Sequence, residues 1–198
     1  MPPHVAALLL AAGLSRRMGA CKQLLPLEGK TVIGRCIELL LDAGITEVIV
    51  VLNPLGDEVA QAVKGYPVSV VRTAAPEVEM AESVRTGTAA LSAATTGVVV
   101  ALCDHPLVSP ESVKLLSAMH RKEPDTIVIP LHGGRKGHPT LFPRPLLDRL
   151  DEPLTLRDLV RNNPGLVRHA EVADPGVVLD MDTPEEYQAM IELCRTAG

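Results

Sequence analysis

The chain has 198 residues, a length that suits one domain, and 46% of them are hydrophobic, enough for a sizeable core. Its formal net charge is −5 and only 2% of its residues are aromatic. This composition disfavours duplex nucleic acid, stacked single strands and anionic membranes as partners. The four cysteines have neither C-x-x-C nor zinc-site spacing, which indicates reduced thiols. With no secretory leader pattern at the N-terminus, we expect a cytoplasmic protein.

Strand and helix patterns alternate along most of the chain. Residues 5–11 form a continuous apolar run that predicts a strand buried on both faces. Further strands are predicted at residues 46–52, 67–71, 97–102 and 126–130, and helices at residues 31–43, 56–64 and 81–94 and after Pro110. Buried strands that alternate with helices favour a three-layer, Rossmann-like α/β fold with a mostly parallel central sheet.

The alternation of strand and helix patterns is interrupted in the last third of the chain. Residues 132–175 are richer in proline, glycine and charge, and we expect a substrate-facing lobe there, within a single domain of residues 1–198. A strand is predicted at residues 177–179. The last helix is predicted to begin with Thr183 as N-cap, Pro184 in the first turn and Glu186 completing a capping box. In open α/β sheets ligands bind beyond the carboxyl ends of the strands, so the residues after Ala11, Leu102 and Leu179 are the places to seek a site.

The loop that follows the first strand is equipped to bind an anion. Its two glycines, Gly13 and Gly19, permit tight turns that bring backbone N–H groups close to a ligand. Arg17 offers a planar fork of donors for phosphate oxygens, and Lys22 a mobile point charge. The glycine spacing fits neither the Walker A loop nor the dinucleotide G-x-G-x-x-G motif. The alternative is a strand-to-helix loop with solvated basic residues.

Residues 10–22 read L-A-A-G-x-S-x-R-M-G-x-x-K, which resembles the signature of the MobA-like nucleotidyltransferases. Within that family the resemblance is closest to the molybdenum cofactor cytidylyltransferases. It implies a nucleotidyltransferase fold and a bound nucleoside triphosphate, with Lys22, Arg17 and Asp104 as catalytic residues. The nucleotide-binding residues implied are Leu10, Ala11, Ala12, Gly13, Ser15, Arg17, Lys22 and Ser83.

Two acidic segments resemble the family's metal-binding positions. Asp104 lies in a D-x-P segment after a predicted strand, where a carboxylate can hold Mg²⁺ against triphosphate oxygens. Its alternative role is to cap a loop before Pro106. Residues 180–187 resemble D-x-D-T-P-E-D-Y, and a strand that extended through them would point Asp180 and Asp182 to the same side. One of these two can complete the magnesium shell while the other caps the helix, and the sequence leaves their assignment open.

Residues 134–139 resemble the family's G-R-x-G-H-P loop, which faces the second substrate. The resemblance implies that Arg135, Lys136 and His138 bind the acceptor. Two departures bear on substrate identity. Residues 79–87 align with G-M-S-S-S-L-R-x-G, but glutamate or alanine replaces the first glycine and two serines. Residues 151–158 retain only the arginine of the G-D-x-G-A-R segment that molybdopterin enzymes carry.

The activity implied by the resemblance is nucleotidyl transfer from a triphosphate, CTP first, to a phosphorylated acceptor such as molybdopterin, with release of pyrophosphate. Mg²⁺ is the expected cofactor, and a client molybdoenzyme is a possible partner. One alternative keeps the reaction but takes a sugar or alditol phosphate as acceptor. Another is a maturation chaperone that holds the molybdenum cofactor without turnover, and release of pyrophosphate separates it from the enzyme.

Overall fold

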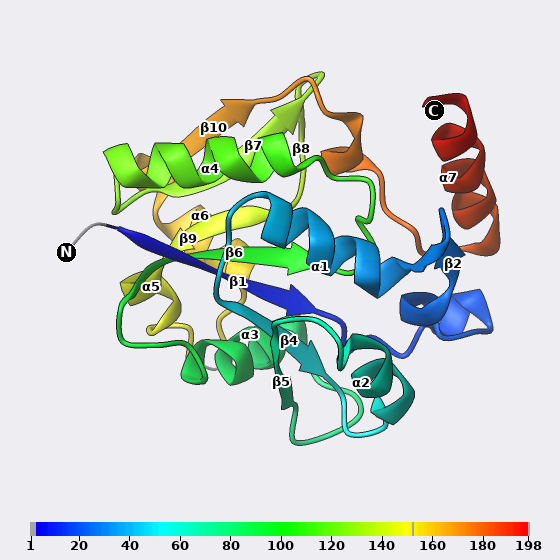
Figure 1. Cartoon of the computed structure of the whole chain (residues 1–198). Helices are drawn as coiled ribbons and strands as arrows, with labels where there is room; N and C mark the ends of the chain where they lie inside the picture. The colour runs from blue at the N-terminus through cyan, green and yellow to red at the C-terminus, as the bar shows by residue number, and fades with distance from the viewer. Residues whose placement is uncertain (1–2, 152, 198) are drawn as a thin grey trace.

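The computed structural model describes residues 3–151 and 153–197, and its centre is an eight-stranded sheet (Figure 1). Seven strands lie in the order β10-β7-β9-β6-β1-β4-β5, and β8 pairs with β7. Among the described strands of this central sheet, only β9 and β8 run antiparallel to their neighbours. The predicted mostly parallel sheet is therefore confirmed. The strands are β1 (His4–Leu10), β4 (Val48–Leu52), β5 (Ser69–Arg72), β6 (Thr95–Leu102), β7 (Ile127–His132), β8 (Arg135–Lys136), β9 (Thr140–Pro143) and β10 (Val167–Glu171).

Helices cover both faces of the sheet, which gives the three layers expected (Figure 1). Alternate residues of β1 divide between two cores: Ala7 and Leu9 pack on one face, Ala6 and Leu8 on the other. The first face is covered by α1 (Val32–Asp42), α2 (Asp57–Val63) and α4 (Pro110–Lys122). Helix α7 (Pro184–Ala197) lies past the carboxyl ends of β1 and β6, beside β2 (Pro26–Leu27) (Figure 1). The second face is covered by α3 (Met80–Ala89), α5 (Arg144–Leu147) and α6 (Leu156–Asn162). Within the described residues no helix combines the length and apolar character needed to cross a bilayer.

Local capping signals fix where several helices begin. The Thr31 side chain accepts a hydrogen bond from Gly34 N at the start of α1. The capping box predicted for α7 is present: Thr183 Oγ1 accepts from Glu186 N, and the Glu186 carboxylate accepts from Thr183 N. Helix boundaries therefore follow the sequence closely, although the helix predicted at residues 81–94 ends at Ala89.

The strand predicted at residues 177–179 is wrong. Pro175–Val178 form a 3₁₀ helix, η4, because Pro175 favours a helical first turn and the Asp174 carboxylate accepts from Gly176 N at 2.9 Å. Gly176 also allows a close approach, since a Cβ there would lie 2.1 Å from Leu107 O. The segment before η4, residues 132–175, places β9 and β10 in the central sheet. Whether this segment faces a substrate stays a prediction.

Candidate active site

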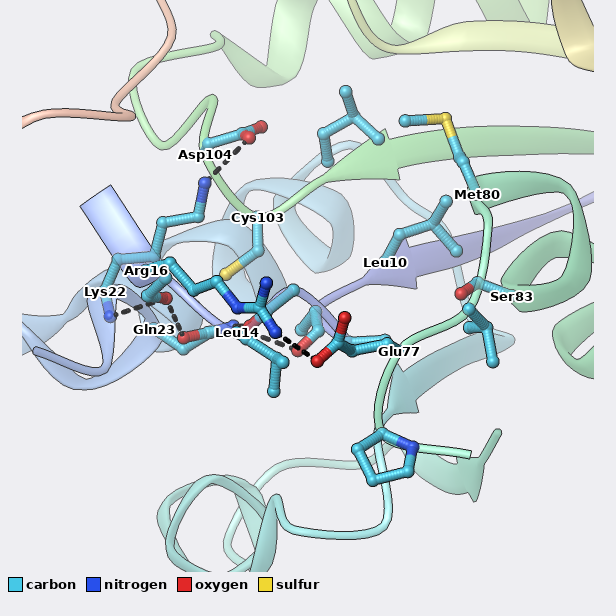
Figure 2. Close-up of a pocket in the computed structure, with 17 residues that line it drawn as sticks. Leu10, Leu14, Arg16, Lys22, Gln23, Glu77, Met80, Ser83, Cys103 and Asp104 are labelled. Carbon is cyan, nitrogen blue, oxygen red and sulfur yellow. Dashed lines mark hydrogen bonds and ion pairs between the residues drawn. The ribbon is translucent and has the colours of Figure 1, made fainter. Parts of the chain in front are cut away.

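One cavity of about 460 Å³ lies at the carboxyl ends of β1 and β6, beside the start of α3 (Figure 2). Its size suits a ligand as large as a nucleotide. The residues predicted to bind the nucleotide line it, with the exception of Arg17. The lining is Leu10, Ala11, Ala12, Gly13, Leu14, Ser15, Arg16, Lys22, Gln23, Pro76, Glu77, Val78, Met80, Ser83, Leu102, Cys103 and Asp104.

The loop after β1 turns tightly before it reaches Lys22. Ser15 has a positive φ of 51° and Gly19 one of 66°, and between them lies the short 3₁₀ helix η1 (Arg16–Met18). A second 3₁₀ helix, η2 (Lys22–Leu24), follows and directs the Lys22 side chain toward Asp104, as Figure 2 shows. The two turns bring Lys22 back over the end of β1, so that it lines the same cavity as Gly13.

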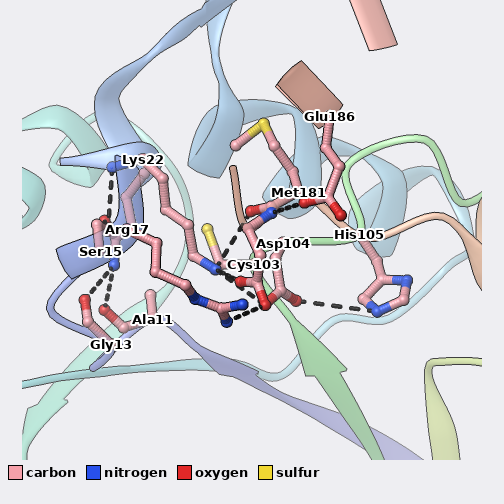
Figure 3. Close-up of polar contacts among 12 residues, drawn as sticks. Ala11, Gly13, Ser15, Arg17, Lys22, Cys103, Asp104, His105, Met181 and Glu186 are labelled. Carbon is pink, nitrogen blue, oxygen red and sulfur yellow. Dashed lines mark hydrogen bonds and ion pairs between the residues drawn. The ribbon is translucent and has the colours of Figure 1, made fainter. Parts of the chain in front are cut away.

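Lys22 lies between two carboxylates (Figure 3). Its Nζ is 2.9 Å from Asp104 Oδ2 and 3.0 Å from Asp182 Oδ1, and it donates to Met181 O at 3.4 Å. Burial lowers the pKa of Lys22, but the ion pairs with Asp104 and Asp182 outweigh burial, and the net shift is upward. The ammonium is therefore charged at neutral pH. It links Asp104, in the segment after β6, to Asp182, in the segment after η4.

Arg17 reaches the same cluster from outside. Its guanidinium pairs with Asp182 Oδ2, while the other carboxylate oxygen of Asp182 pairs with Lys22. Burial raises the pKa of Asp182, but the two cations outweigh it and the net shift is downward. Two cations and two carboxylates thus compensate each other, and any triphosphate or metal ion that enters must rearrange these pairs.

The carboxylates partly fit a divalent cation. Asp104 Oδ1 is buried and has no hydrogen-bond partner among the described residues, so this oxygen can accept a metal ion. Asp182 lies across Lys22 from Asp104 and offers the second carboxylate. In the described part of the chain, no group of three His, Cys, Asp or Glu side chains is arranged to hold a metal by itself. A metal bound here therefore needs oxygen ligands from the phosphates or water.

Two histidines pack beside Asp104. The ring centroids of His105 and His138 are 5.2 Å apart, and His105 Nε2 lies 3.9 Å from Asp104 Oδ1. Burial lowers the pKa of His138 to about 4, and His105 adds to the shift, so His138 is neutral at pH 7. The Nδ1 atoms of both rings are buried without a partner among the described residues. His138 thus packs on His105, which lies beside Asp104, and its contact with an acceptor stays a prediction.

Three other predicted site residues are not part of this cluster. Arg135 and Lys136 are exposed on β8, in the hairpin that follows β7. Asp180 is exposed in the segment between η4 and α7, where no strand aligns it with Asp182. The structure thus places Asp182 next to Lys22, whereas Asp180 lies outside the cluster of Lys22, Asp104 and Asp182.

The sequence analysis missed four polar residues of the site. Gln23 and Asn53 are buried and donate hydrogen bonds to backbone carbonyls of the loop after β1. Arg16 pairs with Glu77, which joins that loop to the segment before α3 (Figure 2). Gln23 could have been noticed as a polar residue between Lys22 and the apolar residues that follow. No local signal marks Asn53 or Glu77.

Comparisons with known proteins agree with this geometry. Residues 7–172 match the family of the MobA-like NTP transferase domain. Among curated proteins, the chain is 28% identical to the nicotine blue oxidoreductase of Paenarthrobacter nicotinovorans, over 96% of this chain and 97% of that protein. It is 24% identical to the molybdenum cofactor cytidylyltransferase of Escherichia coli strain K12, over 91% and 92% of the two chains. The relatives thus differ in the activities for which they are named.

Solved structures share the whole fold. A nucleotidyl transferase from Methanothermobacter thermautotroptrophicus superposes with a TM-score of 0.86 at 26% identity, covering 98% of this chain and 99% of the other. A protein from Mycobacterium tuberculosis H37Rv, solved in complex with manganese, has a TM-score of 0.78 at 27% identity, over 96% of this chain and 98% of the other. The likeness extends from the first strand to the last helix.

Proposed function

The chain belongs to the MobA-like NTP transferase family, and from this premise we propose that it transfers a nucleotidyl group from CTP to a phosphorylated acceptor, releasing pyrophosphate. The observation that carries the proposal is the cavity of about 460 Å³ that the loop after β1 lines together with Lys22 and Asp104. It combines backbone turns for phosphates, a cation and a carboxylate in one place.

The chain's own residues can perform the transfer by position and charge. A phosphomonoester acceptor is already anionic near neutral pH, so its oxygen can attack the α-phosphate without a strong general base. Lys22 would leave its carboxylate partners and stabilise charge on the transferred and leaving phosphates, and Arg17 would do the same from the rim. Water in the cavity is displaced when the triphosphate fills it.

A divalent cation fits this scheme, with Asp104 and Asp182 as the residues that would hold it. The free oxygen of Asp104 and the manganese complex of the Mycobacterium tuberculosis relative support this assignment. When bound, the ion would neutralise phosphate charge and orient the triphosphate. We propose magnesium as the ion because it binds carboxylates and phosphate oxygens together.

The acceptor side of the site would lie beyond Asp104. His138 packs against His105, which lies beside Asp104. Arg135 and Lys136 on β8 can attract an anionic acceptor. The molybdenum cofactor is the first candidate acceptor, which the name of the Escherichia coli relative supports. CTP is preferred over GTP because Ala11 and Ala12 precede Gly13, where guanylyltransferase relatives more often carry a second glycine.

Pyrophosphate release tests the proposal. The purified chain is incubated with each of the four nucleoside triphosphates, with magnesium or manganese, and with the molybdenum cofactor, a sugar phosphate or an alditol phosphate. We expect the highest rate with CTP and the molybdenum cofactor. Equal or faster turnover with GTP overturns the choice of base, and turnover only with a sugar or alditol phosphate overturns the acceptor. Nucleotide binding without pyrophosphate from any pair favours the chaperone alternative.

A further inference from the structure

Gln23 is buried in the wall of the cavity and uses every hydrogen-bonding group of its amide. It is 2% exposed. Its Nε2 donates to Ala11 O at 3.0 Å and to Gly13 O at 2.9 Å, and its Oε1 accepts from Ser15 Oγ and Cys21 Sγ, both at 3.1 Å. An amide side chain has two N–H donors and two acceptor lone pairs, so Gln23 is fully satisfied. A residue needed only for packing would not require this arrangement.

These bonds fix the direction of two peptide planes. In a trans peptide the C=O and the following N–H point in opposite directions. Because the carbonyls of Ala11 and Gly13 both point at Gln23, the N–H groups of Ala12 and Leu14 both point away from it. Asn53 holds the carbonyl between them, since its Nδ2 donates to Ala12 O at 2.8 Å. The loop is therefore held from two sides in the free protein.

The two N–H groups are free to meet a ligand. In the described part of the chain, neither Ala12 N nor Leu14 N donates a hydrogen bond, and both residues line the cavity. Gln23 also supports Lys22, because the Ser15 hydroxyl that donates to Gln23 accepts from Lys22 N at 3.1 Å. One buried amide thus holds the loop backbone and, through Ser15, the start of the segment that carries the cation.

We propose that Gln23 is a positioning residue of the nucleotide site: it presents the N–H groups of Ala12 and Leu14 to the nucleotide and sets the backbone of Lys22. This inference rests on the proposed function, because it assumes that a triphosphate occupies the cavity. Gln23 does not touch the reacting atoms. It acts by preorganising donors that would otherwise have to be ordered when the ligand binds.

The test compares Gln23→Met, which keeps the length but removes all four hydrogen bonds, with Gln188→Met, the same exchange at an exposed position of α7. Binding of CTP with magnesium is measured by calorimetry, turnover by pyrophosphate release, and folding by circular dichroism. We expect Gln23→Met to raise the Kd and KM for CTP about 10–100-fold, the range for weakened hydrogen bonds to charged groups, with a smaller change in kcat. Gln188→Met should leave all three unchanged.

A second variant covers the case in which Gln23→Met does not fold. Gln23→Glu is nearly isosteric, but an ionised carboxylate cannot donate to Ala11 O and Gly13 O. A buried carboxyl has a raised pKa, and once protonated it donates one O–H. The loss of CTP affinity relative to wild type should therefore shrink as the pH is lowered from 8 to 6. A role in stability alone predicts a lower melting temperature with a constant affinity ratio.

The outcomes separate the two proposals. If wild type binds CTP and the folded Gln23 variants bind it equally well at every pH, the positioning role is wrong and the proposed function stands. If wild type binds none of the four triphosphates with either metal, both are wrong. Weaker binding by both Gln23 variants, with pH-dependent recovery for Gln23→Glu alone, supports the positioning role.

Discussion

Replacing Lys22 with methionine tests the charge cluster directly. The side chain is 11% exposed, and its ammonium lies 2.9 Å from Asp104 Oδ2 and 3.0 Å from Asp182 Oδ1. Lys22→Met keeps the length of the side chain and removes the charge. The two carboxylate oxygens then lie at most about 6 Å apart, the limit set by their distances to the same nitrogen, and no cation remains between them, although Arg17 still pairs with Asp182.

The expected loss of stability follows from Coulomb's law. Two unit charges about 6 Å apart repel by roughly 0.7–3 kcal/mol for effective dielectric constants of about 80 down to 20. The lost attraction of two partly buried ion pairs adds to this. We expect a destabilisation of about 2–4 kcal/mol at pH 7, which for a chain of this size lowers the melting temperature by about 4–16 °C. The deficit should shrink at acid pH, because Lys22 no longer lowers the pKa of Asp182 in the variant and protonation of Asp182 removes the repulsion.

The assay is thermal unfolding of wild type and Lys22→Met at pH 7, with and without magnesium or manganese. A divalent cation can take the place of the ammonium between Asp104 and Asp182, so added metal should raise the melting temperature of the variant more than that of wild type. Lys30→Met is the matched control. Lys30 is 52% exposed and pairs with Glu38, so its loss should lower the melting temperature far less than the loss of Lys22, with no response to metal.

Two results would refute this reasoning. A melting temperature of Lys22→Met equal to that of wild type would mean that the cluster contributes nothing to stability. A destabilised variant that responds to metal no more than wild type would mean that Asp104 and Asp182 do not form a cation site, and the search for metal ligands would move to Asp180.

Three further predictions follow from the same geometry. Asp104→Asn should raise the magnesium concentration needed for pyrophosphate release, because an amide is a poorer ligand for hard cations; an unchanged requirement would leave Asp104 with a capping role. Gly13→Ala should fold normally, since nothing lies within 4 Å of the added Cβ, yet it should weaken CTP binding about tenfold, because the methyl group intrudes on a ligand in the cavity. Equal affinity of the variant and wild type in calorimetry would argue against this placement of the nucleotide. His138 should reduce stability by up to roughly 3 kcal/mol as the pH falls from 6.5 to 4, because its pKa is about 4 when folded and about 6.5 when unfolded, so that unfolding takes up a proton. Urea unfolding of His138→Asn should therefore show a smaller decline over that range than wild type.

Sequence reasoning located the features that depend on neighbouring residues. The capping box at Thr183 is visible within four residues, and it is present in the structure. Apolar periodicity identified the buried strands β1 and β6 in the same way. Local patterns were therefore sufficient for the order of the main elements from β1 to β7 and for the end of the sheet where the cavity lies.

Features that depend on contacts between distant segments were not predictable in the same way. The short apolar run at residues 177–179 suits a strand by composition, but the Asp174 cap and the contact of Gly176 with Leu107 make the adjoining segment a 3₁₀ helix. Likewise, the motifs named Lys22, Asp104 and Asp182 separately, yet nothing local indicates that the lysine lies between the two carboxylates. The role of Gln23 depends on carbonyls 10 and 12 residues away.

The separation of Lys22 and Asp182 by 160 residues has a consequence for biosynthesis. A ribosome makes Lys22 and Asp104 before Asp182, so a nascent chain carries an incomplete charge cluster until Asp182 emerges. The ion pairs of Asp182 with Lys22 and Arg17 are therefore absent until that point in synthesis. Before Asp182 emerges, the growing chain depends on the packing of its sheet for stability.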